Sequence, residues 1–259
     1  MSDAAAAATA WPLITDPWFY AVAVPGALMI GVSKSGFASG MGTLAVPLMA
    51  LTVSVPQAAA ITLPVLMAAD ITGLQQLWRE RDASLLRILI VPGLLGIVLG
   101  WVLFGLLSPQ MVSGVVGALT LLFLAQRLLF PPKVEGSVAS PMVGRALAVT
   151  SGFTSFISHA GGPPIAAYLL PMRLDPRRLA GTSAVYFAVI NVSKVVPYAT
   201  LGLVDLRNVL TSLVLLPLAP LGVWLGIWAL KRVDNTWFYR LAYGFMAVTG
   251  VKLLWDGLR

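Results

Sequence analysis

Long apolar segments without charged residues dominate the pattern of hydrophobic and polar positions along this chain. No Asp, Glu, Lys or Arg lies between Lys34 and Asp70, an interval of 35 residues, or between Arg87 and Arg127, an interval of 39 residues. A bilayer core about 30 Å thick accommodates roughly 20 helical residues. Each interval is therefore too long for one membrane span, and the chain must turn back within it.

Proline marks the expected turns, at Ser54–Pro56 and Ser108–Gln110, because it cannot continue a preceding helix. With these turns, the pattern predicts eight long membrane spans. They lie near Trp18–Val32, Val55–Leu77, Leu85–Leu107, Gln110–Phe130, Met142–Ile157, Leu179–Leu201, Val209–Leu230 and Thr236–Trp255. Two further apolar stretches, Gly40–Thr52 and Pro163–Met172, are short for a full crossing, and we interpret them as half-helices or re-entrant segments.

Composition supports a membrane protein and excludes the soluble classes, nucleic-acid binders and cytosolic enzymes among them. Only 10% of the 259 residues are charged, against roughly 25% in an ordinary soluble domain. Hydrophobic residues make up 58%, and the mean hydropathy is +0.88. The chain has no cysteine and one histidine, so we expect neither disulfides nor a metal site. The net charge of +7 is typical of Lys and Arg retained in cytoplasmic loops.

The two halves of the chain match each other. At an offset of 121 residues, Gly31 aligns with Gly152 and Gly40 with Gly161. At an offset of 126, the segment LGIVLG at 95–100 aligns with LGVWLG at 221–226. We interpret residues 1–259 as one membrane domain with repeats at about 18–130 and 142–256, joined by the polar connector 131–141.

Basic residues predict how the repeats are oriented. They cluster in a few connectors and their flanks: Arg79, Arg81, Arg87, Arg127, Lys133, Arg145, Arg173, Arg177, Arg178, Lys231 and Arg232. If the short stretches cross the membrane, each half has five crossings and every basic cluster lies on one side, as the positive-inside rule requires. The repeats are then inverted. If the short stretches are re-entrant, four crossings per half make the repeats parallel. We favour an all-α bundle of two inverted repeats with broken or half helices at mid-membrane.

Four ionisable residues lie inside the expected spans and need a partner or a polar cavity, because a charge at mid-bilayer costs about 2.5–3.5 kcal/mol. They are Lys34, Asp70, His159 and Lys194. Asn191 aligns with Asp70 at the offset of 121. As structural alternatives, His159 is an interhelical hydrogen-bonding residue and Lys194 neutralises Asp70.

Runs of small residues, GVSKSGFASGMG and GFTSFISHAGGPP, surround Lys34 and His159. Broken helices at matching places in two repeats are typical of a transporter site at mid-membrane. Half-helices beginning near Gly40 and Pro163 would direct free N–H groups into such a cavity. Together with Lys34, these groups and the hydroxyls favour an anion. The hydroxyls belong to Ser33, Ser35, Ser155 and Ser158.

The segments GVSKSGFASGMGTLAVPLM and GFTSFISHAGGPPIAAYLLP resemble the duplicated signature of the TauE/SafE family of sulfite exporters. The resemblance covers about residues 18–256 and implies a multi-pass bacterial inner-membrane permease for sulfite, sulfonates or related organic anions. It marks Gly31, Ser33, Lys34, Gly36, Gly40 and Gly42 in the first motif, and Gly152, Ser155, Ser158, His159, Gly161, Gly162 and Pro163 in the second.

Our hypothesis is a secondary transporter of a small sulfur-containing or carboxylate anion that works by alternating access. The substrate would bind between the two runs, and His159, Asp70, Lys194 and Asn191 are candidates for proton coupling. An anion channel with the same broken helices is the alternative, which single-channel currents far above transporter turnover would reveal. An intramembrane enzyme would need a nucleophile or paired carboxylates, and Asp70 is the one acid at depth. The sequence lacks the phosphate-binding GxxxxGK[ST] motif, and we expect no cofactor.

Overall fold

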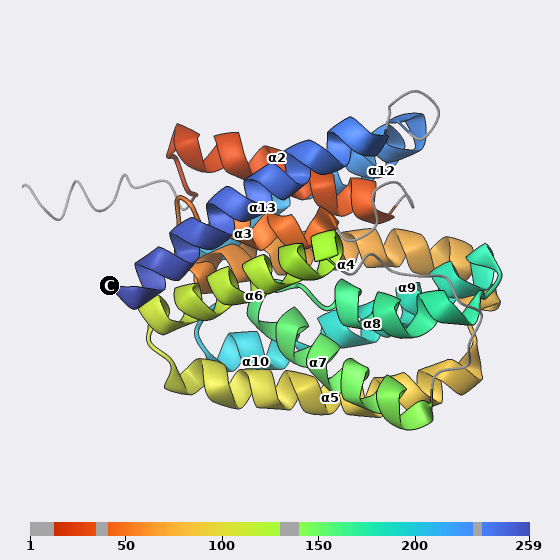
Figure 1. The fold of residues 1–259 in the computed structure, drawn as a ribbon. Helices are drawn as coiled ribbons and strands as arrows, with labels where there is room; N and C mark the ends of the chain where they lie inside the picture. The colour runs from red at the N-terminus through yellow and green to blue at the C-terminus, as the bar shows by residue number, and fades with distance from the viewer. Residues whose placement is uncertain (1–12, 35–40, 130–139, 230–234) are drawn as a thin grey trace, which may run out of the picture.

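The computed structural model describes residues 13–34, 41–129, 140–229 and 235–259, and these residues form an all-helical bundle (Figure 1). The first half contains α2 (Pro17–Lys34), η1 (Met41–Leu44), α3 (Ala45–Met49), α4 (Val55–Leu77), η2 (Trp78–Glu80), α5 (Ala83–Leu106) and α6 (Pro109–Leu129). The second half contains α7 (Pro141–Ser158), α8 (Gly162–Leu169), η3 (Leu170–Met172), α9 (Pro176–Ser193), α10 (Val195–Thr200), α11 (Leu206–Leu215), α12 (Leu218–Ala229) and α13 (Asn235–Leu258).

The expected turns lie where proline and capping residues place them. Ser54 caps α4 by accepting a hydrogen bond from the backbone N–H of Gln57, and α6 begins at Pro109. Two expected spans are interrupted. Lys194 separates α9 from α10, and a turn at Leu216 and Pro217 separates α11 from α12. The second interruption follows from Pro217, which has no N–H for a helical hydrogen bond.

Five helical segments of the described chain are long and apolar enough to cross a membrane. They are Val55–Glu80, Ala83–Leu106, Pro109–Gln126, Pro176–Thr200 and Leu206–Gly226. The other long spans expected from the sequence correspond to α2, α7 and α13, which are helical but do not combine the same length and apolarity. Exposed apolar residues on α5, among them Val91, Leu95 and Val102, give that helix an outer surface suited to lipid.

The helices of the bundle approach each other closely at glycine residues. α5 packs on α7, α2 on α12 and α6 on α13, while α4 packs on α9 between them (Figure 1). A Cβ atom at Gly96 of α5 would overlap the carbonyl oxygen of Val149 on α7, and one at Gly222 of α12 would overlap that of Leu28 on α2. Small residues let membrane helices approach this closely, so glycine is required at both contacts.

The start of α9 is fastened to the connector between α4 and α5. The Arg178 guanidinium forms an ion pair with Asp82, whose backbone N–H donates to Thr182 Oγ1 (2.9 Å). Asp82 also caps α5, accepting hydrogen bonds from the N–H groups of Ser84 and Leu85. Burial by itself raises the pKa of Asp82, but these hydrogen bonds and the Arg178 guanidinium outweigh it and lower the pKa below its usual value.

Replacing Gly152 with alanine is expected to destabilise the protein, because the new Cβ atom would overlap the carbonyl oxygen of Gly93. The expected loss is on the order of 1–3 kcal/mol in the free energy of unfolding, measured in detergent. Gly244→Ala on α13 is the matched control, since a Cβ atom there meets nothing within 4 Å. It should be neutral or slightly stabilising, because alanine favours helices over glycine. Equal stability of the two variants would contradict the close contact.

Candidate functional site

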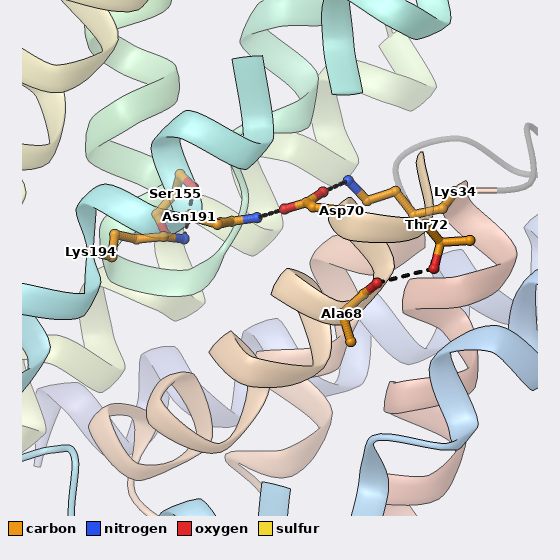
Figure 2. A network of polar contacts seen from close by, with 7 residues as sticks. All are labelled: Lys34, Ala68, Asp70, Thr72, Ser155, Asn191 and Lys194. Carbon is orange, nitrogen blue, oxygen red and sulfur yellow. Dashed lines mark hydrogen bonds and ion pairs between the residues drawn. The ribbon is translucent and has the colours of Figure 1, made fainter. Parts of the chain in front are cut away.

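Polar side chains from α2, α4, α7 and α9 meet inside the otherwise apolar bundle. Figure 2 shows Lys34 directed at Asp70, Asp70 at Asn191, and Lys194 at Ser155. Asp70, Asn191 and Lys194 are almost fully buried. Buried polar groups are costly unless they are paired, and this cluster meets that requirement through its own hydrogen bonds.

Asp70 on α4 is the centre of the first group of contacts. Its Oδ1 atom accepts a hydrogen bond from Lys34 Nζ (2.5 Å), and its Oδ2 atom accepts one from Asn191 Nδ2 (2.5 Å). Lys34 is the last residue of α2, and its side chain is 28% exposed against 3% for Asp70. The ring of Phe187 lies 5.4 Å from Lys34 Nζ and adds a cation–π contact. Lys34 is therefore the charged group of this pair with access to solvent.

Lys194, at the break between α9 and α10, is the centre of the second group. Its side chain is fully buried, and its Nζ atom contacts the carbonyl oxygen and the Oγ atom of Ser155 (both 3.2 Å) and His159 Nδ1 (2.6 Å). An ammonium has three N–H donors, and three acceptors surround it here. These acceptors are neutral groups, so none of the three contacts is an ion pair.

His159 connects this group to α4. Its Nε2 atom lies 2.9 Å from the carbonyl oxygen of Ala59, and its Nδ1 atom faces Lys194. This arrangement fits a neutral imidazole that donates from Nε2 and accepts at Nδ1. The backbone of His159 is left-handed (φ 55°) and ends α7. A non-glycine residue adopts this conformation at some cost, so its surroundings hold it there.

The segment between α7 and α8 is held by two hydroxyl groups. Ser151 Oγ donates to the carbonyl oxygen of Gly161 (2.7 Å), and Thr154 Oγ1 donates to that of Ala160 (2.9 Å). Neither residue was singled out from the sequence as a site residue, although both lie within the second small-residue run or directly before it. The signal in the sequence that could have identified them is a Ser or Thr one to two turns before the end of a helix, where its hydroxyl can reach the backbone that follows.

The structure brings the expected site residues together in two groups, one around Asp70 and one around Lys194. Helix α9 connects the groups, because Asn191 and Lys194 are three residues apart and lie at neighbouring positions of its surface. Asp70 forms its direct ion pair with Lys34, whereas the hydrogen bonds of Lys194 go to Ser155 and His159. The neutralising role considered for Lys194 stays a prediction. Ser33 and Gly42 lie in contact, since a Cβ atom at Gly42 would be 3.4 Å from that of Ser33.

The remaining expected site residues are placed less directly. Ser158 is buried, and its hydroxyl donates to the carbonyl oxygen of Thr154 (3.4 Å). Gly161 caps α8 and Gly162 begins it. Ser35, Gly36 and Gly40 lie outside the described residues.

The free N–H groups expected at the start of α8 are fewer than the sequence interpretation assumed. α8 begins at Gly162 and continues with Pro163 and Pro164. Proline has no N–H, so two of the first three residues of this helix cannot donate to an anion. An anion at this end of α8 would therefore depend on side-chain donors more than on the N–H groups of the half-helix.

Among the described residues, no group of three His, Cys, Asp or Glu side chains could hold a metal ion. The family model described as sulfite exporter TauE/SafE matches residues 23–253, most of the chain. No curated protein and no solved structure gave a significant match.

We expect Lys34 and Asp70 to be energetically coupled. Asp70→Asn leaves the ammonium without its counter-ion, and Lys34→Gln leaves the carboxylate without its cation. Each should lower the free energy of unfolding by about 2 kcal/mol, below the 3–5 kcal/mol of a fully buried pair because Lys34 is partly exposed. The double variant should lose on the order of 1–3 kcal/mol less than the sum, measured by unfolding in mixed detergents. Strict additivity would contradict the pairing.

Proposed function

Because the chain belongs to the sulfite exporter TauE/SafE family, we propose that it is a secondary transporter that moves a small anion by alternating access. The chain is a membrane transporter of the sulfite and anion type, and five helical segments within its described residues are long and apolar enough to span a bilayer. The proposed substrate is sulfite, a sulfonate or a related sulfur-containing organic anion. The proposed setting is the bacterial inner membrane.

The described residues of the cluster include two lysines, Lys34 and Lys194, and one acid, Asp70, and this surplus of basic side chains carries the anion proposal. Lys34 and Asp70 compensate each other, whereas the hydrogen bonds of Lys194 go to neutral groups. If both lysines are protonated and His159 is neutral, the described residues of the cluster would carry one positive charge more than the carboxylate of Asp70 compensates. An uncompensated charge at this depth is costly, and a bound anion would relieve that cost.

The proposed substrate site lies between the two small-residue runs. Lys34 is its charged ligand because it is the partly exposed ammonium of the cluster. Hydroxyl groups would add hydrogen bonds, as anions prefer several donors. The proposed substrate-binding residues are Ser33, Lys34, Ser35, Gly36, Gly40, Gly42, Ser155, Ser158, His159, Gly161 and Gly162.

Matching contacts in the two halves support inverted repeats with broken helices. Gly96 packs on Val149 of α7 and Gly222 packs on Leu28 of α2, and these pairs correspond at the offsets of 126 and 121 residues. Asp70 and Asn191, which also correspond at 121, are hydrogen-bonded to each other. Equivalent residues meet in this way where two repeats face each other across a shared axis.

Proton coupling through His159 and Lys194 is the finer part of the proposal. The 2.6 Å contact between Lys194 Nζ and His159 Nδ1 has room for one proton. Protonating His159 at Nδ1 would set two N–H groups against each other, so Lys194 would have to lose a proton or move away. Asp70 and Asn191 would pass such a movement to Lys34 through the hydrogen bonds that link them.

Replacing Lys34 with alanine is expected to reduce anion flux into proteoliposomes by about tenfold or more, because a charge-assisted hydrogen bond to the substrate is lost. The double variant Lys34→Gln with Asp70→Asn removes both charges of the ion pair together and should be equally inactive while inserting normally. Lys252→Ala is the matched control, since that lysine pairs with Asp256 on α13, away from the cluster. Normal sulfite and sulfonate flux in the Lys34 variants would contradict the site.

Replacing His159 with glutamine is expected to abolish stimulation of anion flux by an imposed pH gradient while exchange of anion for anion continues. Glutamine can still bond to Ala59 and Lys194 but cannot titrate. Thr150→Ala is the control, since this exposed residue of α7 bonds to the carbonyl oxygen of Ala146, and the variant should keep the response to the gradient. An unchanged response in His159→Gln would remove His159 from the coupling mechanism.

A further inference from the structure

Two contacts at opposite ends of the bundle correspond to each other residue by residue. At the offset of 121 residues, Gln57 of α4 matches Arg178 of α9, and at the offset of 126, Asp82 matches Asn208. Arg178 forms its ion pair with Asp82, and Gln57 Nε2 donates to Asn208 Oδ1 (3.1 Å). Equivalent positions of the two repeats therefore hold a charged contact at one end of the bundle and a neutral amide contact at the other.

A second bond accompanies each contact one helical turn further along. Thr182 Oγ1 accepts from the backbone N–H of Asp82, and Ser212 Oγ donates to the carbonyl oxygen of Ile61 (2.9 Å). Ile61 and Thr182 also correspond at the offset of 121. The two contacts thus share their position on α4 and α9 and differ in charge.

The contacts lie far apart along the bundle. Gln57 is in the first turn of α4, whereas the contact with Arg178 lies beyond the end of α4, where Gly181 packs against the carbonyl oxygen of Leu77. Twenty helical residues span about 30 Å, the thickness of a bilayer core. The buried Asp70 cluster lies between them, because Asp70 is on α4 between Gln57 and Leu77.

We propose that the Gln57–Asn208 and Arg178–Asp82 contacts are the two gates of the transport path, each closing one end of the anion site, and that the ion pair makes the Arg178 end the more firmly closed. This inference rests on the proposed alternating access. Arg178 belongs to the basic connectors expected on the cytoplasmic side, so this gate faces the cytoplasm. Gln57 and Asn208 form the gate on the other side.

The absence of cysteine from the chain allows a direct test with one introduced thiol. Ser158→Cys places the thiol beside His159, where the side chain is buried. A membrane-impermeant maleimide is added to right-side-out and inside-out vesicles, and the labelling rate is measured from each face. Labelling needs no knowledge of the transported anion.

Breaking each contact should shift labelling in opposite directions. Arg178→Gln should raise labelling from the cytoplasmic face and lower it from the other face, and Gln57→Ala should do the reverse. The expected change is roughly twofold to fivefold, because pairs with one exposed partner contribute little. Arg178→Lys, which keeps the charge, should label like the parent.

Lys252→Gln is the matched control, since it breaks the ion pair with Asp256 within α13 and should leave both rates unchanged. Equal changes from both faces, no change in either gate variant, or no labelling from either face in any variant would overturn the gates. Failure of the anion site is distinguished by flux. Full flux in the Lys34 variants contradicts that site, whereas opposite labelling shifts still support the gates.

Discussion

Every polar group in the interior of a bilayer must find its partner within the protein, because no water is there to replace a missing hydrogen bond. The polar interior of this bundle follows from that requirement. Lys34, Asp70 and Asn191 satisfy one another across three helices, and the ammonium of Lys194 is held by Ser155 and His159. The backbone where α7 ends is likewise bonded by hydroxyl groups of its own helix. Because the polar groups of the cluster are hydrogen-bonded to one another, a substrate ion would have to compete with these hydrogen bonds.

Helix α9 joins the two groups of contacts. Asn191 binds Asp70 on one side, and Lys194 binds Ser155 and His159 on the other. Helix α9 ends directly before Lys194, and helix α10 begins directly after it. A movement of α9 relative to α4 would therefore alter the partners of Asp70 and Lys194 together. This coupling is what the proposed transport cycle requires of a bundle whose central helices are α4 and α9.

Much of the helical arrangement could be predicted from the sequence. The charge-free intervals and Pro56 and Pro109 located α4, α5 and α6 to within a few residues, since proline and the bilayer thickness act locally. The break at Lys194 was not predicted, although Pro197 follows three residues later and has no N–H to bond to the carbonyl oxygen of Ser193. The start of α8 has few N–H groups to offer an anion, because Pro163 and Pro164 follow Gly162.

The sequence by itself indicated a helical membrane protein of the TauE/SafE family, with Lys34, Asp70, His159 and Lys194 as ionisable residues inside its expected spans. The membrane character depends on composition and on the length of the apolar segments, and the family follows from the two glycine-rich motifs. Only the tertiary structure decided that Asp70 pairs with Lys34, that Lys194 binds His159, and that the carbonyl oxygen of Ala59 is a partner of the imidazole. Such contacts depend on how helices distant in sequence are rotated against each other, and hydropathy carries no information about that rotation.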